Sequence, residues 1–182
     1  SGGNYNVAVG DEAGTAITTG DRNTAVGFEA LKTATTAQYN TAIGYQALEA
    51  NTGNNNTAVG DQALEANIGG ANNSALGDDA LVANTTGSSN TAMGGSALAA
   101  NTTASYNTAV GTSSLGANTV GAHNTSMGSD SMFTNILGSK SVAIGSGSLY
   151  TQNYGSATDA FNTAVGYNAG VSVTTGIKNT LI

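Results

Sequence analysis

The residues of this sequence that could carry out acid–base or nucleophilic chemistry are few and scattered. His123 is the only histidine, there is no cysteine, and the stretch from Gly145 to Ser148 lacks the spacing of a nucleophile elbow. No glycine-rich phosphate loop with its lysine occurs. The sequence therefore predicts no catalytic residue, no metal ligand set and no cofactor, and it indicates a protein that is not an enzyme.

A five-residue signature, Asn-Thr-Ala-(Val/Ile/Leu/Met)-Gly, recurs along the whole chain. Any functional site must therefore be built from side chains that repeated units hold in place. The first residues of the signature are Asn6, Asn23, Asn40, Asn56, Asn73, Asn90, Asn107, Asn124, Ser141, Asn162 and Asn179. We number the positions of each unit from this residue. The period is 17 residues, with one shorter unit after Asn40 and one longer unit after Ser141. Such a period indicates a solenoid in which each unit forms one coil, and we expect one repeat domain over 1–182.

The alternation of residue types within a unit predicts the coil. Position 4 is always large and apolar, and position 9 is Leu or Met in most units. Because side chains alternate along a strand, we expect positions 2 and 4 to point inward from one strand and positions 9 and 11 from a second. Ala58 and the other alanines at position 3 would then form a smooth outer face against another chain. The fold class is predicted to be all-β, a parallel β-solenoid of about ten 17-residue coils.

Asparagine recurs at positions 1 and 12, and acidic residues gather at positions 6 and 7. Stacked amides can both donate and accept hydrogen bonds, so we expect the two asparagine columns to form ladders along the solenoid. The acidic residues follow the signature glycine at Asp11, Glu12, Glu29, Asp61, Asp78, Asp79 and Asp130. We interpret them as solvated corners of the coils, with a cation bound between neighbouring coils as the alternative.

The repeats resemble a known family. Units such as Asn40-Thr-Ala-Ile-Gly44 and Ser141-Val-Ala-Ile-Gly145 are similar to the head repeats of trimeric autotransporter adhesins, the YadA-like heads. They also resemble the related 17-residue repeat arrays of phage tail fibres and bacterial surface proteins. The resemblance covers essentially the whole chain. It implies a left-handed β-roll, three chains around one axis, and an extracellular fibre that adheres or carries an adhesive tip. Two departures are the longer period and the threonine that mostly replaces the inward valine.

The long unit after Ser141 contains the best candidates for contact with a partner. It carries Tyr150, Tyr154, Asp159 and Phe161, and solenoids often place partner contacts on such insertions. Exposed tyrosine combines an apolar face with a polar tip, which suits a glycan or a cell-surface receptor. Asn-x-Ser/Thr sequons are further candidates, for glycosylation, and we expect them in or beside an exposed loop. They begin at Asn55, Asn72, Asn84, Asn101 and Asn124.

Charge and hydropathy exclude several classes of partner. The 182 residues include 4 Lys and Arg against 11 Asp and Glu, for a formal net charge of -7. Nucleic acid binding needs clusters of Lys and Arg, so we expect no nucleic acid partner. No apolar run approaches the roughly 18 residues of a membrane-spanning helix, and we expect no membrane-spanning segment.

These patterns favour a non-enzymatic structural protein. We expect an extracellular fibre or filament segment on a cell surface or virion, serving adhesion or as a rigid spacer. Its partners would be copies of itself, in a trimer or in an end-to-end self-assembling filament. An ice-binding solenoid is the alternative that the threonine column suggests, although we expect that column to face inward. A glycosidase or lyase β-helix is a third class, for which the sequence lacks the carboxylate constellation.

Overall fold

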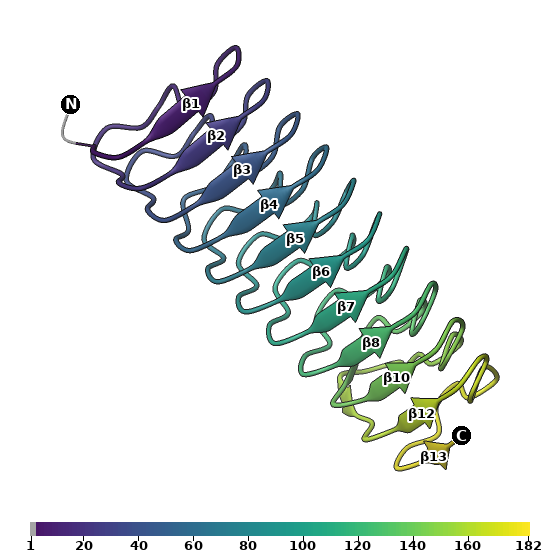
Figure 1. The fold of residues 1–182 in the computed structure, drawn as a ribbon. Helices are drawn as coiled ribbons and strands as arrows, with labels where there is room; N and C mark the ends of the chain where they lie inside the picture. The colour runs from purple at the N-terminus through teal and green to yellow at the C-terminus, as the bar shows by residue number, and fades with distance from the viewer. Residues whose placement is uncertain (1–2) are drawn as a thin grey trace.

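Each coil contributes one short strand, formed by the β-branched and small residues of the signature (Figure 1). The computed structural model describes residues 3–182. The strands are β1 (Val7–Val9), β2 (Thr24–Val26), β3 (Thr41–Ile43), β4 (Thr57–Val59), β5 (Ser74–Leu76), β6 (Thr91–Met93), β7 (Thr108–Val110), β8 (Thr125–Met127), β9 (Gly138–Ser139), β10 (Val142–Ile144), β11 (Thr158–Asp159), β12 (Thr163–Val165) and β13 (Thr180–Leu181).

The strands pair in parallel, and the repeat sets their register. An 11-stranded sheet runs β1-β2-β3-β4-β5-β6-β7-β8-β10-β12-β13, and β9 pairs with β11 in a separate two-stranded sheet. Equivalent residues of neighbouring coils face each other, as in the pairing of Ala25 with Ala42 and of Ala42 with Ala58. The chain is therefore an all-β parallel β-solenoid of about ten turns with about 17 residues in each turn, as predicted.

The prediction of which signature residues point inward was wrong. Ala58 is 0% exposed and belongs to the core, whereas Leu76, at position 4 of the next coil, is 47% exposed. Alanine at position 3 is buried from β2 to β12 except at β8, where a buried serine replaces it. Positions 2 and 4 lie on the outer face of the sheet. The strand lies so close to the opposite wall of the coil that only the small side chains of alanine and serine are buried between them.

The expected second strand is absent, because a series of turns occupies positions 6 to 11. The non-glycine residues at positions 7 and 9 have positive φ angles, as at Gln62 (49°) and Leu64 (55°). These left-handed residues interrupt the alternation of side chains. As a result, the adjacent residues Ala63 and Leu64 both point into the core, while position 11 is only partly buried.

The core is a leucine column flanked by alanine columns. The largest fully buried apolar side chains are those at position 9, namely Leu31, Leu48, Leu64, Leu81, Leu98, Leu115, Met132 and Leu149. Positions 3 and 8 face each other across the interior. Where serine occupies both columns, the Ser114 hydroxyl donates to the Ser126 hydroxyl at 2.8 Å. Each of these coils therefore buries one bulky side chain, and polar ladders along the solenoid supplement it.

Two asparagine ladders run through the interior, as predicted. At position 1, the side-chain oxygen of Asn56 accepts the backbone N–H of Asn73 at 2.9 Å. At position 12, the side-chain amide of Asn84 donates to the oxygen of Asn67 at 2.7 Å. Both side-chain NH₂ groups of a coil also donate to one backbone carbonyl, as Asn73 and Asn84 do to Gly87. The ladders satisfy most of the polar groups that they bury, with the side-chain oxygen of Asn118 as an exception.

The insertion of the long unit lies partly inside the solenoid. Gln152 is fully buried and replaces an asparagine of the second ladder, next to the position where Ser141 replaces an asparagine of the first. Its longer side chain donates to the Asn135 oxygen at 3.2 Å and accepts from Asn162 at 2.8 Å. The short pairing of β11 with β9 then returns the chain to register. Only residues 155–157 of the insertion form an exposed loop tip.

Candidate functional site

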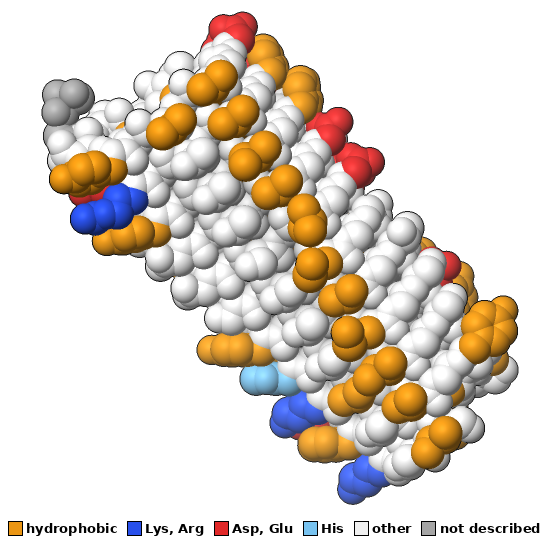
Figure 2. Space-filling view, viewed as in Figure 1, with side chains coloured by type: hydrophobic (Ala, Val, Ile, Leu, Met, Phe, Trp, Pro, Cys, Tyr) orange, Lys and Arg blue, Asp and Glu red, His pale blue; other side chains and the backbone are white. Residues whose placement is uncertain are grey.

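The most distinctive surface is the outer face of the 11-stranded sheet, which an apolar stripe follows along its whole length. We define the apolar stripe as the residues at position 4: Val9, Val26, Ile43, Val59, Leu76, Met93, Val110, Met127, Ile144, Val165 and Ile182. Figure 2 shows these side chains as a diagonal line across the molecule. Eight of them are exposed, and the rest are half-buried. Monomeric proteins rarely expose a continuous apolar patch of this length, so the stripe is the candidate interaction surface of the chain.

A threonine column runs beside the stripe at position 2. It contains Val7, Thr24, Thr41, Thr57, Ser74, Thr91, Thr108, Thr125, Val142, Thr163 and Thr180, none of which is buried. The expectation that this column faces inward was wrong for the same reason as at position 4. The outer face of the sheet is thus uncharged, with hydroxyl groups along one side and apolar groups along the other.

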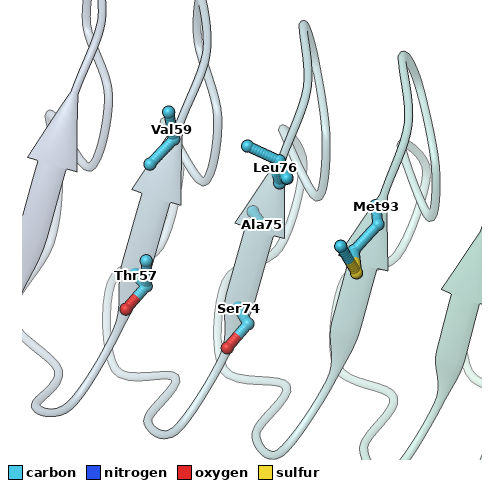
Figure 3. A pocket seen from close by; sticks show the side chains of 6 residues that line it. All are labelled: Thr57, Val59, Ser74, Ala75, Leu76 and Met93. Carbon is cyan, nitrogen blue, oxygen red and sulfur yellow. The ribbon is translucent and has the colours of Figure 1, made fainter.

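The outer face is uneven in its middle. An open hollow of about 300 Å³ is lined by Thr57, Val59, Ser74, Ala75, Leu76 and Met93. Figure 3 shows the long side chains of Leu76 and Met93 standing on the neighbouring strands β5 and β6, with the short Ser74 lower on β5. A surface with such protruding side chains and hollows is suited to a partner of complementary shape.

Rings and cations line one edge of this face, at position 17, directly before each strand. We call this column the ring–cation edge: Tyr5, Arg22, Tyr39, Asn55, Asn72, Ser89, Tyr106, His123, Lys140, Phe161 and Lys178. All eleven residues have positive φ angles near 60°. The side chains stack along the solenoid. Arg22 lies over the rings of Tyr5 and Tyr39, the ring of Tyr106 lies 4.9 Å from that of His123, and Lys140 lies over Phe161.

Acidic residues and three further rings line the other edge, at positions 6 and 7. We call it the acidic edge: Asp11, Glu12, Phe28, Glu29, Tyr45, Asp61, Asp78, Asp79, Asp130 and Tyr167. Figure 2 shows acidic side chains along one side of the apolar stripe, and cations with His123 on the other. Lys32 binds Glu12 and Glu29 at 2.5 and 2.6 Å, which lowers the pKa of Glu29. Among residues 3–182, no group of three His, Asp or Glu side chains could hold a metal ion.

Repulsion builds up where several carboxylates meet without a cation. Partial burial raises the pKa of Glu65, and the charges of Glu49, Asp79 and Asp61 raise it further. Partial burial also raises the pKa of Asp79, with contributions from Asp78 and Asp61. The ionised forms of Glu65 and Asp79 therefore destabilise the folded chain.

The double variant Glu65→Gln/Asp79→Asn is accordingly expected to melt at a higher temperature than the wild type at pH 7. A carboxyl group whose folded pKa is raised binds more protons in the folded than in the unfolded chain, so its destabilising effect is full above the folded pKa and is lost as the pH falls through it to the unfolded pKa. The advantage of the variant should thus vanish as the pH falls to the ordinary carboxyl range. Glu29→Gln is the control of opposite sign, since Glu29 has a lowered pKa. Melting curves from pH 4 to pH 8 measure both, and a constant gap between wild type and double variant would contradict the assignment.

The four contact candidates of the long unit do not form one site. Asp159 and Phe161 lie together at the ring–cation edge, where both contact Lys140, and Asp159 binds its ammonium at 2.6 Å. Tyr150 instead stacks on Phe133, with ring centroids 5.6 Å apart. Tyr154 is only 7% exposed, and its hydroxyl donates to the carbonyl of Gly176. Tyr154 therefore packs the coil and cannot present a contact surface, contrary to our expectation.

The sequon asparagines also divide into two groups. Asn55 and Asn72 are exposed on the ring–cation edge. Asn84, Asn101 and Asn124 are buried members of the ladders, so the expectation that they lie in an exposed loop was wrong. Attaching a glycan to any of these three would require opening the coil.

Groups for catalysis are not assembled by the described residues. Ser148 is buried, and its hydroxyl donates to the carbonyl of Gly145 at 2.8 Å, so the Gly145–Ser148 stretch presents no nucleophile. His123 stacks on Tyr106 at the surface. None of the described residues lies in a helix of the length and apolarity needed to cross a membrane.

Comparison with known proteins finds similarity of fold. No family model matches the chain, and no curated protein matches it significantly. Among solved structures, the chain is similar to the crystal structure of the collagen-binding domain of the Yersinia adhesin YadA, with 16% sequence identity and a TM-score of 0.36. The similarity covers 99% of this chain and 68% of that one. This similarity concerns the fold alone.

Proposed function

We propose that this chain is a non-enzymatic segment of an extracellular fibre, in which three copies associate side by side through the apolar stripe. The observation that carries the proposal is the continuous exposure of large apolar side chains on the outer face of the sheet. Packing that face against other copies removes the side chains from water, and each fully buried one contributes about 1.5–3 kcal/mol. The resemblance of the repeats to trimeric adhesin heads supports three as the number of chains.

The role of the fibre is adhesion or spacing at a cell or virion surface. A solenoid whose coils are hydrogen-bonded to their neighbours along the whole rod suits a spacer. Adhesion would use side chains that association leaves exposed, for which Tyr150 remains a candidate beside its stacking partner Phe133. Asn55 and Asn72 remain candidates for glycosylation because their side chains are exposed.

The variant Leu76→Lys is expected to separate the copies while leaving each solenoid folded. A lysine there places a charge at the centre of the proposed contact, where burial without a partner is costly. We expect the mass measured by light scattering or sedimentation to fall from that of the oligomer to that of one chain, with an unchanged circular dichroism spectrum.

Ile68→Lys is the matched control for this measurement. Ile68 is 55% exposed, more than Leu76, but lies at position 13, outside the apolar stripe. It should keep the wild-type mass. A wild-type chain that is monomeric at all concentrations, or a Leu76→Lys variant that keeps the oligomer, would refute association through the stripe.

Ice binding is a second candidate, favoured by the outward threonine column. A regular row of hydroxyl groups on an uncharged sheet could order water, and the row here faces solvent. The hollow between Val59, Leu76 and Met93 makes the face uneven, however, which suits a shaped partner better than a flat ice surface. Thermal hysteresis of the purified wild type tests this candidate, and its absence would exclude ice binding.

A further inference from the structure

The two edges of the exposed sheet face carry opposite charges. The ring–cation edge holds three of the four Lys and Arg residues, Arg22, Lys140 and Lys178, together with the only histidine. Two acidic residues lie beside that edge. Asp159 binds Lys140, and the Asp21 carboxylate accepts the backbone N–H of Asn4. The acidic edge has no cation at positions 6 and 7, and the one cation beside it is Lys32, at position 10, which binds Glu12 and Glu29. In a chain of net charge -7, this segregation gives each copy one edge that could attract the opposite edge of another.

The two edges also correspond at several levels of the solenoid, although Lys140 and Lys178 have no acidic residue at their level. Strand β2 lies between Arg22 on one edge and Phe28 and Glu29 on the other, and strand β8 lies between His123 and Asp130. Where the acidic edge carries Asp61, or Asp78 and Asp79, the ring–cation edge carries the amide donors Asn55 and Asn72 at the same levels. Rings share a level at Tyr39 with Tyr45, and at Phe161 with Tyr167. No acidic residue occupies the ring–cation column at any level.

We propose that the ring–cation edge of one chain docks against the acidic edge of a second copy of this chain, with the two rods parallel and their coils in register. The inference rests on the association proposed above and specifies which side chains meet beside the apolar stripe. Rotation about an axis parallel to the rods places unlike edges together. An antiparallel neighbour, related by a twofold axis across the rods, would instead place acidic edge on acidic edge.

The edges set orientation and register, while the stripe supplies most of the affinity. Exposed ion pairs each contribute little, and complementary charge acts chiefly on specificity. A slip of one coil would still bury the stripe, because all its residues are apolar. The same slip would remove the pairing of Tyr39 with Tyr45 and of His123 with Asp130. A glycan on Asn55 or Asn72 would block the docking of this edge, so glycosylation there and edge docking exclude one another.

Disulfide crosslinking tests the docking directly, because the chain has no cysteine of its own. The double variant Tyr39→Cys/Tyr45→Cys places one thiol on each edge, at the two ends of strand β3. Strand β3 separates the two positions by roughly 15–20 Å, whereas a disulfide needs Cα atoms within about 7 Å. A bridge between them must therefore join two chains.

We expect oxidation of the double variant to give a closed covalent oligomer on a non-reducing gel, and each single variant to stay monomeric on that gel. Tyr39→Cys combined with Asn72→Cys, both on the ring–cation edge, is the matched control and should not crosslink. Covalent dimers from either single variant, or no crosslink from the double variant, would overturn the proposal.

Charge reversal gives an independent measurement. His123→Glu and Asp130→Lys should each weaken association roughly tenfold. Each substitution disrupts the complementary pairing of these two side chains, and this small electrostatic penalty recurs at every contact between chains of the closed oligomer. Combining them should restore the wild-type dissociation constant, and the restoration must arise between chains because strand β8 separates the two residues within one. Ile68→Lys also introduces a lysine but lies at position 13, off both edges, and should have no effect.

The outcomes separate the two proposals. If Leu76→Lys dissociates the copies but neither crosslink nor rescue is seen, the stripe is the interface and edge docking is wrong. If the wild type never associates, both proposals fail. Crosslinking into a closed ring together with rescue supports both.

Discussion

The variant Gly60→Ala should destabilise the solenoid by about 3 kcal/mol or more. Gly60 has a φ of +143°, a conformation that costs an alanine of order 1–3 kcal/mol in strain alone. In addition, a Cβ atom there would lie 2.3 Å from the carbonyl oxygen of Gly77 in the next coil. The coil must open to relieve this contact, because the neighbouring atoms are backbone. Chemical denaturation of the variant and the wild type measures the loss.

Gly69→Ala is the control for this substitution. Gly69 is exposed, and a Cβ atom added there meets nothing within 4 Å. Replacement of a glycine by alanine without strain stabilises a protein by about 0.4–1 kcal/mol, through the lower entropy of the unfolded chain. Similar losses from the two variants would show that close approach of neighbouring coils is not what requires glycine at position 5.

The variant Leu64→Ala should lower the free energy of unfolding by about 2–5 kcal/mol per chain. Leu64 is fully buried and is the only bulky apolar side chain inside its coil. The coils above and below are held by their hydrogen bonds to this one, so the cavity cannot close easily.

Val59→Ala is the comparison, because Val59 lies in the same coil as Leu64 but on the outer face, where it is half-buried. In dilute, dissociated protein it should change stability by less than about 0.5 kcal/mol. Equal losses for Leu64→Ala and Val59→Ala would contradict the arrangement in which position 9 points inward and position 4 outward.

The sequence was sufficient to predict the solenoid, its approximate turn number and its ladders. The period is visible in the signature, and a column of asparagines has few structural uses other than stacking. The identity of Leu64 and its equivalents as core residues was also correct. These features depend on the repetition of residue types, which survives even when the direction of each side chain is unknown.

The sequence did not reveal which side of the strand faces inward. Large apolar side chains are usually buried, whereas an alanine is found both in cores and on surfaces and so does not indicate a direction. Here the interior is too narrow at the strand for anything beyond alanine or serine. One signal was available, since position 3 is alanine in nine of the eleven units while position 4 varies among Val, Ile, Leu and Met. A tight interior accepts one size, whereas an outer surface accepts several.

The misplacement of the second strand has a local cause. The adjacent apolar residues Ala63 and Leu64 do not alternate, and their joint burial depends on positive φ angles at Gln62 and Leu64. Nothing in the chemistry of glutamine or leucine favours that conformation, so the turns could not be predicted from residue type. The ring–cation edge and the acidic edge were not predicted as a pair, because aromatic and basic residues were each grouped by residue type and not by their position in the repeat. Arranged by position, Arg22, His123 and Lys140 lie in the same column as Tyr39.

The direction of the hydrogen bonds determines how the solenoid responds to force. Strand pairing links each coil to its neighbours, and the two asparagine ladders add bonds between many of them, so the bonds lie along the axis of the rod. A pull on the two ends therefore loads the coils in series, and the weakest one detaches first. Each coil occupies about 4.8 Å of rod but releases 17 residues, or up to roughly 55–60 Å of extended chain. Under tension, each coil that detaches would therefore become more than ten times longer than it was in the rod. Such stepwise lengthening would dissipate the work of a sudden pull before the ends of the rod are torn from what holds them.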